Sequence, residues 1–173
     1  MESLSGTLKD VVDTVGKTQH HQERLETDSK RLNLKLYGIE ESANEFPAEN
    51  EQKVKSFVSE TLGVETADIE FESVQRLHSM AATRQILARL LRYKHREQIM
   101  KAYREKRKHA NLEVRVGEDL PQRISRARIG LYPLLKESVD AGKVAFFRDY
   151  KLVVGDQVFI YDVDQKKPVN IQK

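Results

Sequence analysis

The sequence contains no cysteine among its 173 residues. That absence excludes a disulfide framework, a zinc site built on thiolates and a cysteine nucleophile, and it is typical of a reducing intracellular compartment. Long hydrophobic runs are also missing, since the apolar stretches span only a few residues, against the roughly 20 needed to cross a bilayer. We therefore expect neither a membrane span nor a signal peptide.

Motifs that carry catalysis are absent too, because the sequence has no GxxxxGK[ST], HExxH or GxSxG pattern. Asp162-Val163-Asp164 is the only DxD element, and a solvated loop is its usual meaning. His20 and His21 have neither a cysteine nor a spaced acidic partner, and the other histidines, His78, His95 and His109, lie among basic residues. We predict no metal, no cofactor and no enzymatic activity.

Charge is distributed unevenly along the chain, although the net charge is only +3. Residues 36–75 hold two basic and ten acidic residues (net −8), whereas residues 76–128 hold fifteen basic and five acidic residues (net +10). Such a basic segment attracts phosphate backbones. Two plainer interpretations stay open: the basic residues coat a solvated helix, or they form structural salt bridges with the acidic segment.

The N-terminal segment, residues 1–31, has the spacing of a coiled-coil helix. Gly6 and Gly16 weaken it, since a glycine costs up to about 1 kcal/mol inside a helix. The apolar seam continues to the start of the next segment. Its predicted oligomerisation residues are Leu4, Leu8, Val11, Val15, Gln22, Leu25 and Leu32.

Residues 32–117 alternate between strand and helix periodicity in the order strand, helix, strand, strand, helix, strand. This order is the split βαβ arrangement of an RNA recognition motif, with both helices on one face of the sheet. The predicted strands cover 32–37, 69–76, 84–91 and 112–116, and the predicted helices cover 47–62 and 92–107.

Residues 118–165 form a second small unit in this interpretation. A helix follows Pro121, and short β-rich runs at 145–147, 152–154 and 158–161 predict an antiparallel meander. Residues 166–173 are interpreted as a frayed tail. The whole chain is therefore predicted to be α+β.

An RNA recognition motif usually stacks bases on aromatic residues of its two central strands. Here Lys35 stands where the first strand would carry an aromatic ring, and the predicted strand 84–91 has no aromatic residue. The sequence therefore argues against stacking on the open sheet face. It favours backbone binding by arginine and lysine, with little sequence preference and a strong dependence on salt.

Three stretches resemble the first open-reading-frame protein of LINE-type retrotransposons. They are Lys30-Arg31-Leu32-Asn33-Leu34 at the junction of coil and strand, Arg92 to Ile99 continued by Ala102 to Lys106, and Arg126 with Leu131 to Glu137. The likeness spans roughly residues 25–161.

The resemblance implies a non-catalytic protein that coats single-stranded RNA, and single-stranded DNA as well, as a nucleic-acid chaperone in a retrotransposon ribonucleoprotein. It implies a coiled-coil homotrimer, favoured over a dimer, in a cytoplasmic particle that also reaches the nucleus. Basic residues of the family match Lys30 and Arg31 before the first strand, Arg76 and Arg84 around the second-to-third strand loop, and Arg126 in the C-terminal helix.

Together these arguments predict a nucleic-acid-binding trough lined by guanidinium groups, which pair with phosphates and stack on bases. A coiled-coil module that binds a protein partner is the alternative, and a metal-dependent nuclease or transposase is a third reading. The predicted binding residues are Lys30, Arg31, Lys35, Arg76, Arg84, Arg89, Arg92, Arg96, Arg104, Arg115, Arg123, Arg126, Arg128 and Tyr150.

Overall fold

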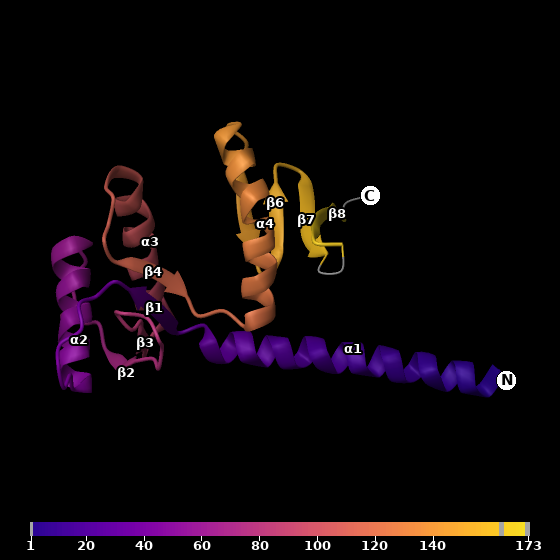
Figure 1. Cartoon of the computed structure of the whole chain (residues 1–173), viewed down its shortest axis with the longest axis horizontal. Coiled ribbons are helices and arrows are strands. Elements are labelled where there is room, and N and C mark those ends of the chain that lie inside the picture. The colour runs from indigo at the N-terminus through magenta and orange to yellow at the C-terminus, as the bar shows by residue number, and fades with distance from the viewer. Residues whose placement is uncertain (1, 163–164, 172–173) are drawn as a thin grey trace. The chain divides into compact units, whose positions relative to one another are not determined.

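The computed structural model describes residues 2–162 and 165–171, apart from the side chains of residues 2–5 and 20 (Figure 1). Over these residues the chain is mixed α+β, with four α-helices and two four-stranded antiparallel sheets. It divides into two compact units, unit 1 from Met1 to Asp119 and unit 2 from Leu120 to Lys173.

Helix α1 (Glu2–Lys30) is one continuous helix in Figure 1. The seam residues Leu8, Val11, Val15 and Leu25 are between 49% and 69% exposed, so within unit 1 no described residue buries this apolar stripe. Leu4 falls among the side chains outside the description. Leu32 was predicted to continue the seam, but α1 ends at Lys30, and the Leu32 carbonyl accepts a hydrogen bond from Leu90 N at 3.1 Å.

The sheet of unit 1 has the strand order β2-β3-β1-β4, and every neighbouring pair is antiparallel. Leu34 and Leu36 of the central strand β1 are 1% exposed and face the core, whereas Lys35 and Tyr37 point to the opposite face because strand side chains alternate. The strands are β1 (Asn33–Tyr37), β2 (Phe71–Arg76), β3 (Ile86–Leu90) and β4 (Arg115–Glu118).

Two helical segments contribute to the core of unit 1. α2 (Pro47–Ser56) begins with proline, which suits the first turn of a helix, and continues into a π-helical turn η1 (Phe57–Thr61). Gly63 follows this turn with φ +70°, the left-handed conformation in which a glycine often ends a helix. α3 (Tyr93–His109) packs Ile99, Met100 and Tyr103 inward, as its spacing predicts.

The observed strands of unit 1 are shorter than their sequence patterns. Arg84 and Gln85 precede β3, and Leu112 and Val114 precede β4. Leu112 and Val114 are partly buried and pack against the core, so their alternation comes from burial and not from strand pairing. A pattern of period two therefore predicts the buried face better than it predicts the strand ends.

Unit 2 consists of helix α4 (Gln122–Asp140) and a four-stranded meander in the order β5-β6-β7-β8. Leu131 and Leu152, both fully buried, lie at the centre of its small core. The predicted frayed tail at 166–173 is wrong in part, because residues 167–170 form a strand paired with β7. The strands are β5 (Ala145–Arg148), β6 (Lys151–Val154), β7 (Gln157–Asp162) and β8 (Lys167–Asn170).

Candidate nucleic-acid interface

Arg76, at the end of β2, is a buried arginine with structural partners. Its side chain is 4% exposed, and its Nε lies 2.8 Å from Glu45 Oε2. Its Nη1 and Nη2 groups donate to three backbone carbonyls, those of Ile39, Glu40 and Arg84, at 2.7–2.8 Å, and Nη2 also donates to Glu45 Oε1 at 3.1 Å. Such a guanidinium joins the loop after β1 to the edge of the sheet and presents little surface to a ligand.

The hydrogen bond from Arg76 holds the pKa of Glu45 at about 2, against an ordinary value of 4.5, and a bond from Lys53 adds to this effect. Burial acts in the opposite direction. Glu45 therefore stays ionised at neutral pH. Its charged partners, Arg76 and Lys53, both belong to unit 1.

Arg84 and Arg89, two more predicted binding residues, also pair with the acidic segment. Arg84 donates to Glu41, and Arg89 donates to Glu72 and to the Ser29 carbonyl, the latter at 2.7 Å. Arg92 is mostly exposed, and its Nη2 lies 3.9 Å from Glu70 Oε1. The structural salt bridges that the charge pattern left open are therefore present at these positions.

Arg96 belongs to the interior as well. Its side chain is 8% exposed and pairs with Glu97 and, at 2.8 Å, with Glu118 of β4. Its guanidinium also lies 5.8 Å from the Tyr93 ring centroid. Arg96 thus ties α3 to the edge strand and lies away from solvent.

The face of the unit 1 sheet opposite the helices carries a polar network at its centre. Lys35 Nζ lies 2.8 Å from Asp119 Oδ1, and Asn33 Nδ2 donates to Asp119 Oδ2 at 2.9 Å. Burial alone would raise the pKa of Asp119, but these hydrogen bonds outweigh it and the pKa is lowered. At the position where an RNA recognition motif usually carries an aromatic ring for base stacking, this sheet carries the ion pair of Lys35 and Asp119.

Helix α3 carries cations of a different kind. Five of its lysine and arginine side chains are exposed and take part in no salt bridge within the described part of the chain. Some of them, with Glu97 and Gln98, line a shallow groove of about 610 Å³. We call these five residues the α3 cations: Lys94, Lys101, Arg104, Lys106 and Arg107.

Part of this charge stabilises the helix itself. Lys106, Arg107, Lys108 and His109 lie in the last turn of α3, where positive side chains interact favourably with the helix dipole. Lys108 also pairs with Glu105 at 2.9 Å. Lys94, Lys101 and Arg104 lie outside that turn, so the dipole does not account for them.

The predicted residues at the junction of coil and strand differ from each other. Lys30 pairs with Glu26 one turn earlier in α1, at 2.7 Å. Arg31 is exposed in the turn before β1 and forms no salt bridge with any described residue. Arg31 is therefore the available cation of this pair.

In unit 2 the predicted arginines lie along the first half of α4. Arg123 and Arg126 are exposed, whereas Arg128 donates from Nε to the Asp149 carbonyl at 2.7 Å and lies 5.3 Å from the Phe147 ring centroid. Arg128 lines an apolar hollow of about 380 Å³ together with Ile129, Tyr132 and Phe147.

Two cations on the meander of unit 2 escaped the sequence prediction. Arg148 lies 5.9 Å from the Phe146 ring centroid, and Lys151 lies 5.4 Å from the ring of the predicted residue Tyr150. The signal that could have found them is the Phe-Phe-Arg-Asp-Tyr-Lys run itself, in which cations and rings alternate across a tight turn.

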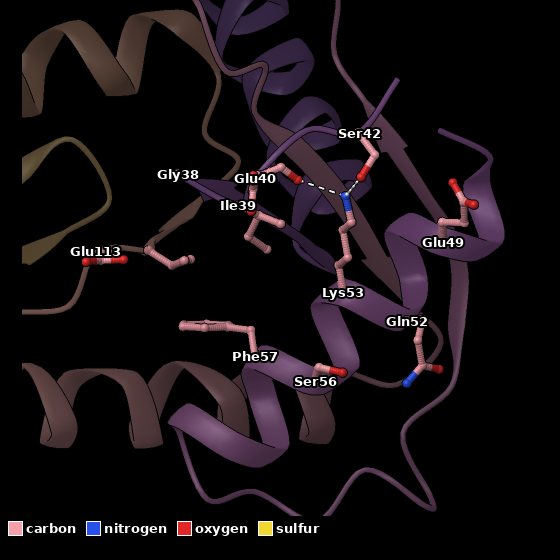
Figure 2. Close-up of a pocket in the computed structure, with 11 residues that line it drawn as sticks. Gly38, Ile39, Glu40, Ser42, Glu49, Gln52, Lys53, Ser56, Phe57 and Glu113 are labelled. Atoms are coloured by element: carbon pink, nitrogen blue, oxygen red, sulfur yellow. Dashed lines mark hydrogen bonds between the residues drawn. The ribbon is translucent and has the colours of Figure 1, made fainter. Parts of the chain in front are cut away.

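A larger hollow, of about 660 Å³, lies between α2 and the segment before β4 (Figure 2). Phe57 forms part of its lining, together with the acidic residues Glu40, Glu49 and Glu113. The ammonium group of Lys53 donates hydrogen bonds to the Glu40 carbonyl, to Ser42 Oγ and to the Glu45 carboxylate. With acidic residues in its lining and Lys53 already engaged, the hollow is not assigned to the phosphate-binding surface.

Other chemistry has less support in the geometry. Within the described residues, no group of three or more His, Asp or Glu side chains is placed to hold a metal ion. In the DxD element, Val163 and Asp164 lie outside the described residues. Over the same part of the chain, no helix combines the length and apolarity needed to span a membrane.

A comparison of the chain with protein-family models finds no match, and a comparison with curated proteins finds none either.

Proposed function

We propose that this protein binds single-stranded nucleic acid through its phosphate backbone, with little sequence preference, and has no catalytic role. The α3 cations carry this proposal, because they are exposed and form no salt bridge with a described residue, although Glu97 lies in the same groove. Flexible ammonium and guanidinium groups on a helix surface match a phosphate chain without reading its bases.

The topology of residues 33–118 supports an atypical RNA recognition motif as the scaffold. The elements follow the order β1, α2, β2, β3, α3, β4 in a sheet of order β2-β3-β1-β4, and this chain order supports a split βαβ scaffold. Lys35 and Asp119 form an ion pair at the centre of the open sheet face. We therefore assign the proposed binding surface to α3 and not to the sheet. Arg31 and, in unit 2, Arg123 and Arg126 extend the set of contacts.

We further propose self-association through α1, with a second and third copy of the same helix as its partners. Isolated helices are marginal in water, and most helical stability in proteins comes from packing an apolar face. The exposed seam residues Leu8, Val11, Val15 and Leu25 are such a face. The trimer, and its preference over a dimer, come from the likeness to the LINE family.

That likeness also supports the finer parts of the proposal: a nucleic-acid chaperone in a retrotransposon ribonucleoprotein, cytoplasmic and nuclear. Several weak phosphate contacts on each of three chains raise the effective concentration of binding sites along one strand. Weak individual contacts still exchange, which lets strands rearrange while they remain bound.

A coiled-coil module that binds a protein partner is the second candidate, and the bare apolar face of α1 favours it. The two candidates differ in their response to salt. Phosphate binding weakens steeply as salt rises, whereas association through an apolar helix face does not.

Fluorescence anisotropy with labelled single-stranded RNAs of about 20 nucleotides and unrelated sequence tests the proposal. We expect binding to each RNA at low salt, with similar affinities. The double variant Lys101→Gln/Arg104→Gln should weaken binding to all of them equally, and Lys9→Gln/Lys17→Gln, with the same charge change on α1, is the matched control. Absence of binding at low salt would remove the proposal.

A further inference from the structure

Tyr37 ends β1 on the sheet face opposite the helices, directly opposite Arg115 of β4 in the strand register. Its ring lies over the neighbouring strand, because a Cβ placed on Gly117 would be 3.6 Å from Tyr37 Cε2. The guanidinium of Arg115 is 5.3 Å from the ring centroid. A ring therefore lies at one end of this face, although the centre of the sheet has none.

A hollow of about 380 Å³ opens beside this ring. Its size falls at the small end of the roughly 300–1,000 Å³ typical of small-molecule sites. β4 is an edge strand, so no further described strand covers its outer side. The hollow is lined by Tyr37, Tyr103, Arg107, Arg115 and Val116.

The lining combines aromatic surface with positive charge and contains no carboxylate. Arg107 and Arg115 are exposed and take part in no salt bridge with the described residues, in contrast to Arg76, Arg84 and Arg96. A ring with one guanidinium over it and a second in the same hollow fits a planar base that carries a phosphate, since bases stack on aromatic rings and guanidinium groups pair with phosphates.

We propose that this hollow is a nucleotide subsite, in which one unpaired base stacks on Tyr37 while Arg107 and Arg115 hold its phosphate. The guanidinium of Arg115 lies over the ring, so the entering base displaces it, and the side chain then turns toward the phosphate. A paired base inside a duplex cannot reach the ring, so the subsite selects single strands. The inference rests on the proposed nucleic-acid binding and adds a base contact to it.

The test uses the full chain and two single strands of equal length, one normal and one in which every base is replaced by an abasic sugar. Tyr37→Leu removes the ring, and Tyr37→Phe keeps it. We expect Tyr37→Leu to weaken binding of the normal strand about tenfold and to leave binding of the abasic strand unchanged. Tyr37→Phe should bind both strands like the wild type.

A strand carrying 2-aminopurine gives a direct readout, because stacking quenches its fluorescence. Quenching on binding to the wild type and to Tyr37→Phe, but not to Tyr37→Leu, supports the subsite. If Tyr37→Leu lost the same amount of affinity for the normal and the abasic strand, or lost none for either, the subsite would be overturned while the proposed function would remain intact. Failure of the wild type to bind either strand would instead remove the proposed function.

Discussion

Arg76 and Arg104 belong to the same basic segment of the sequence, yet their surroundings give them different roles. Arg76 is 4% exposed and bound to Glu45 and three carbonyl groups, whereas Arg104 is exposed on α3 and forms no salt bridge with a described residue. Breaking a buried pair leaves an uncompensated charge in the interior, whereas an exposed arginine contributes little to stability.

Replacement of Arg76 should therefore affect folding, and replacement of Arg104 should affect binding. We expect Arg76→Ala to lower the free energy of unfolding of unit 1 by about 3 kcal/mol. Arg104→Ala should change it by less than about 0.5 kcal/mol. Urea denaturation followed by NMR signals of unit 1 measures both, and equal effects of the two variants would contradict this division.

The lowered pKa of Glu45 predicts a loss of stability in acid. Its carboxyl group titrates at about 2 in the folded protein and near 4.5 when free, so the stabilisation is complete above pH 4.5 and disappears as the pH falls toward 2. The loss should reach about 3 kcal/mol. Glu45→Gln should be less stable at neutral pH and should lose this part of the pH dependence, as unfolding curves between pH 2 and 6 would reveal.

At the scale of elements, sequence periodicity predicts most helices and strands because each buries one face. The predicted helix 92–107 ends two residues before α3 does, and Ile99, Met100 and Tyr103 of α3 recur at helical spacing and face the core. Periodicity missed β8, since residues 167–170 have one partly buried apolar side chain, Val169, and form a strand only by pairing with β7. Strand formation of this kind depends on tertiary context more than on local preference.

Helix α4 contains a close contact that its sequence does not reveal. A Cβ at Gly130 would lie 2.5 Å from the ring of Tyr161 in β7, so the absence of a side chain lets the meander pack on the helix. This contact depends on two residues far apart in the chain, and periodicity carries no information about it.

Gly130→Ala should therefore destabilise unit 2, although alanine is favoured over glycine inside a helix by up to about 1 kcal/mol. The expected net loss is about 1–3 kcal/mol, typical of overpacking. Loss of the NMR signals of unit 2 at lower urea than in the wild type measures it. A gain in stability would show that the Tyr161 ring moves aside without cost.

At the scale of the whole molecule, the opposite charges of residues 36–75 and 76–128 are only partly matched by folding. Counting charges predicted an excess of cations, but not which arginines Glu41, Glu45 and Glu72 neutralise, because that depends on how the loop after β1 lies against β2 and β3. Of the predicted binding residues, Arg31, Arg104, Arg115 and Arg126 stay exposed without a salt bridge to a described residue.

The exposed apolar seam of α1 predicts that the protein self-associates through this helix. We expect the wild type to form a trimer in analytical ultracentrifugation, and Val11→Gln/Val15→Gln to shift it to monomer because these side chains lie on the proposed contact. Lys9→Gln/Lys17→Gln, also on α1 and off the seam, should leave the trimer intact. A wild type that stays monomeric at every concentration would contradict self-association through this helix.

The central claim is that the unpaired cations of α3, and not the paired arginines of the sheet and its loops, bind phosphate. The most direct test is the slope of log K against log salt concentration for one single-stranded RNA. Each phosphate contact on a single strand contributes about 0.7 to this slope, so Lys101→Gln/Arg104→Gln should reduce it by about 1.4, while Arg84→Gln should leave it unchanged. An unchanged slope in the α3 double variant, or an equal reduction per charge in Arg84→Gln, would contradict the account.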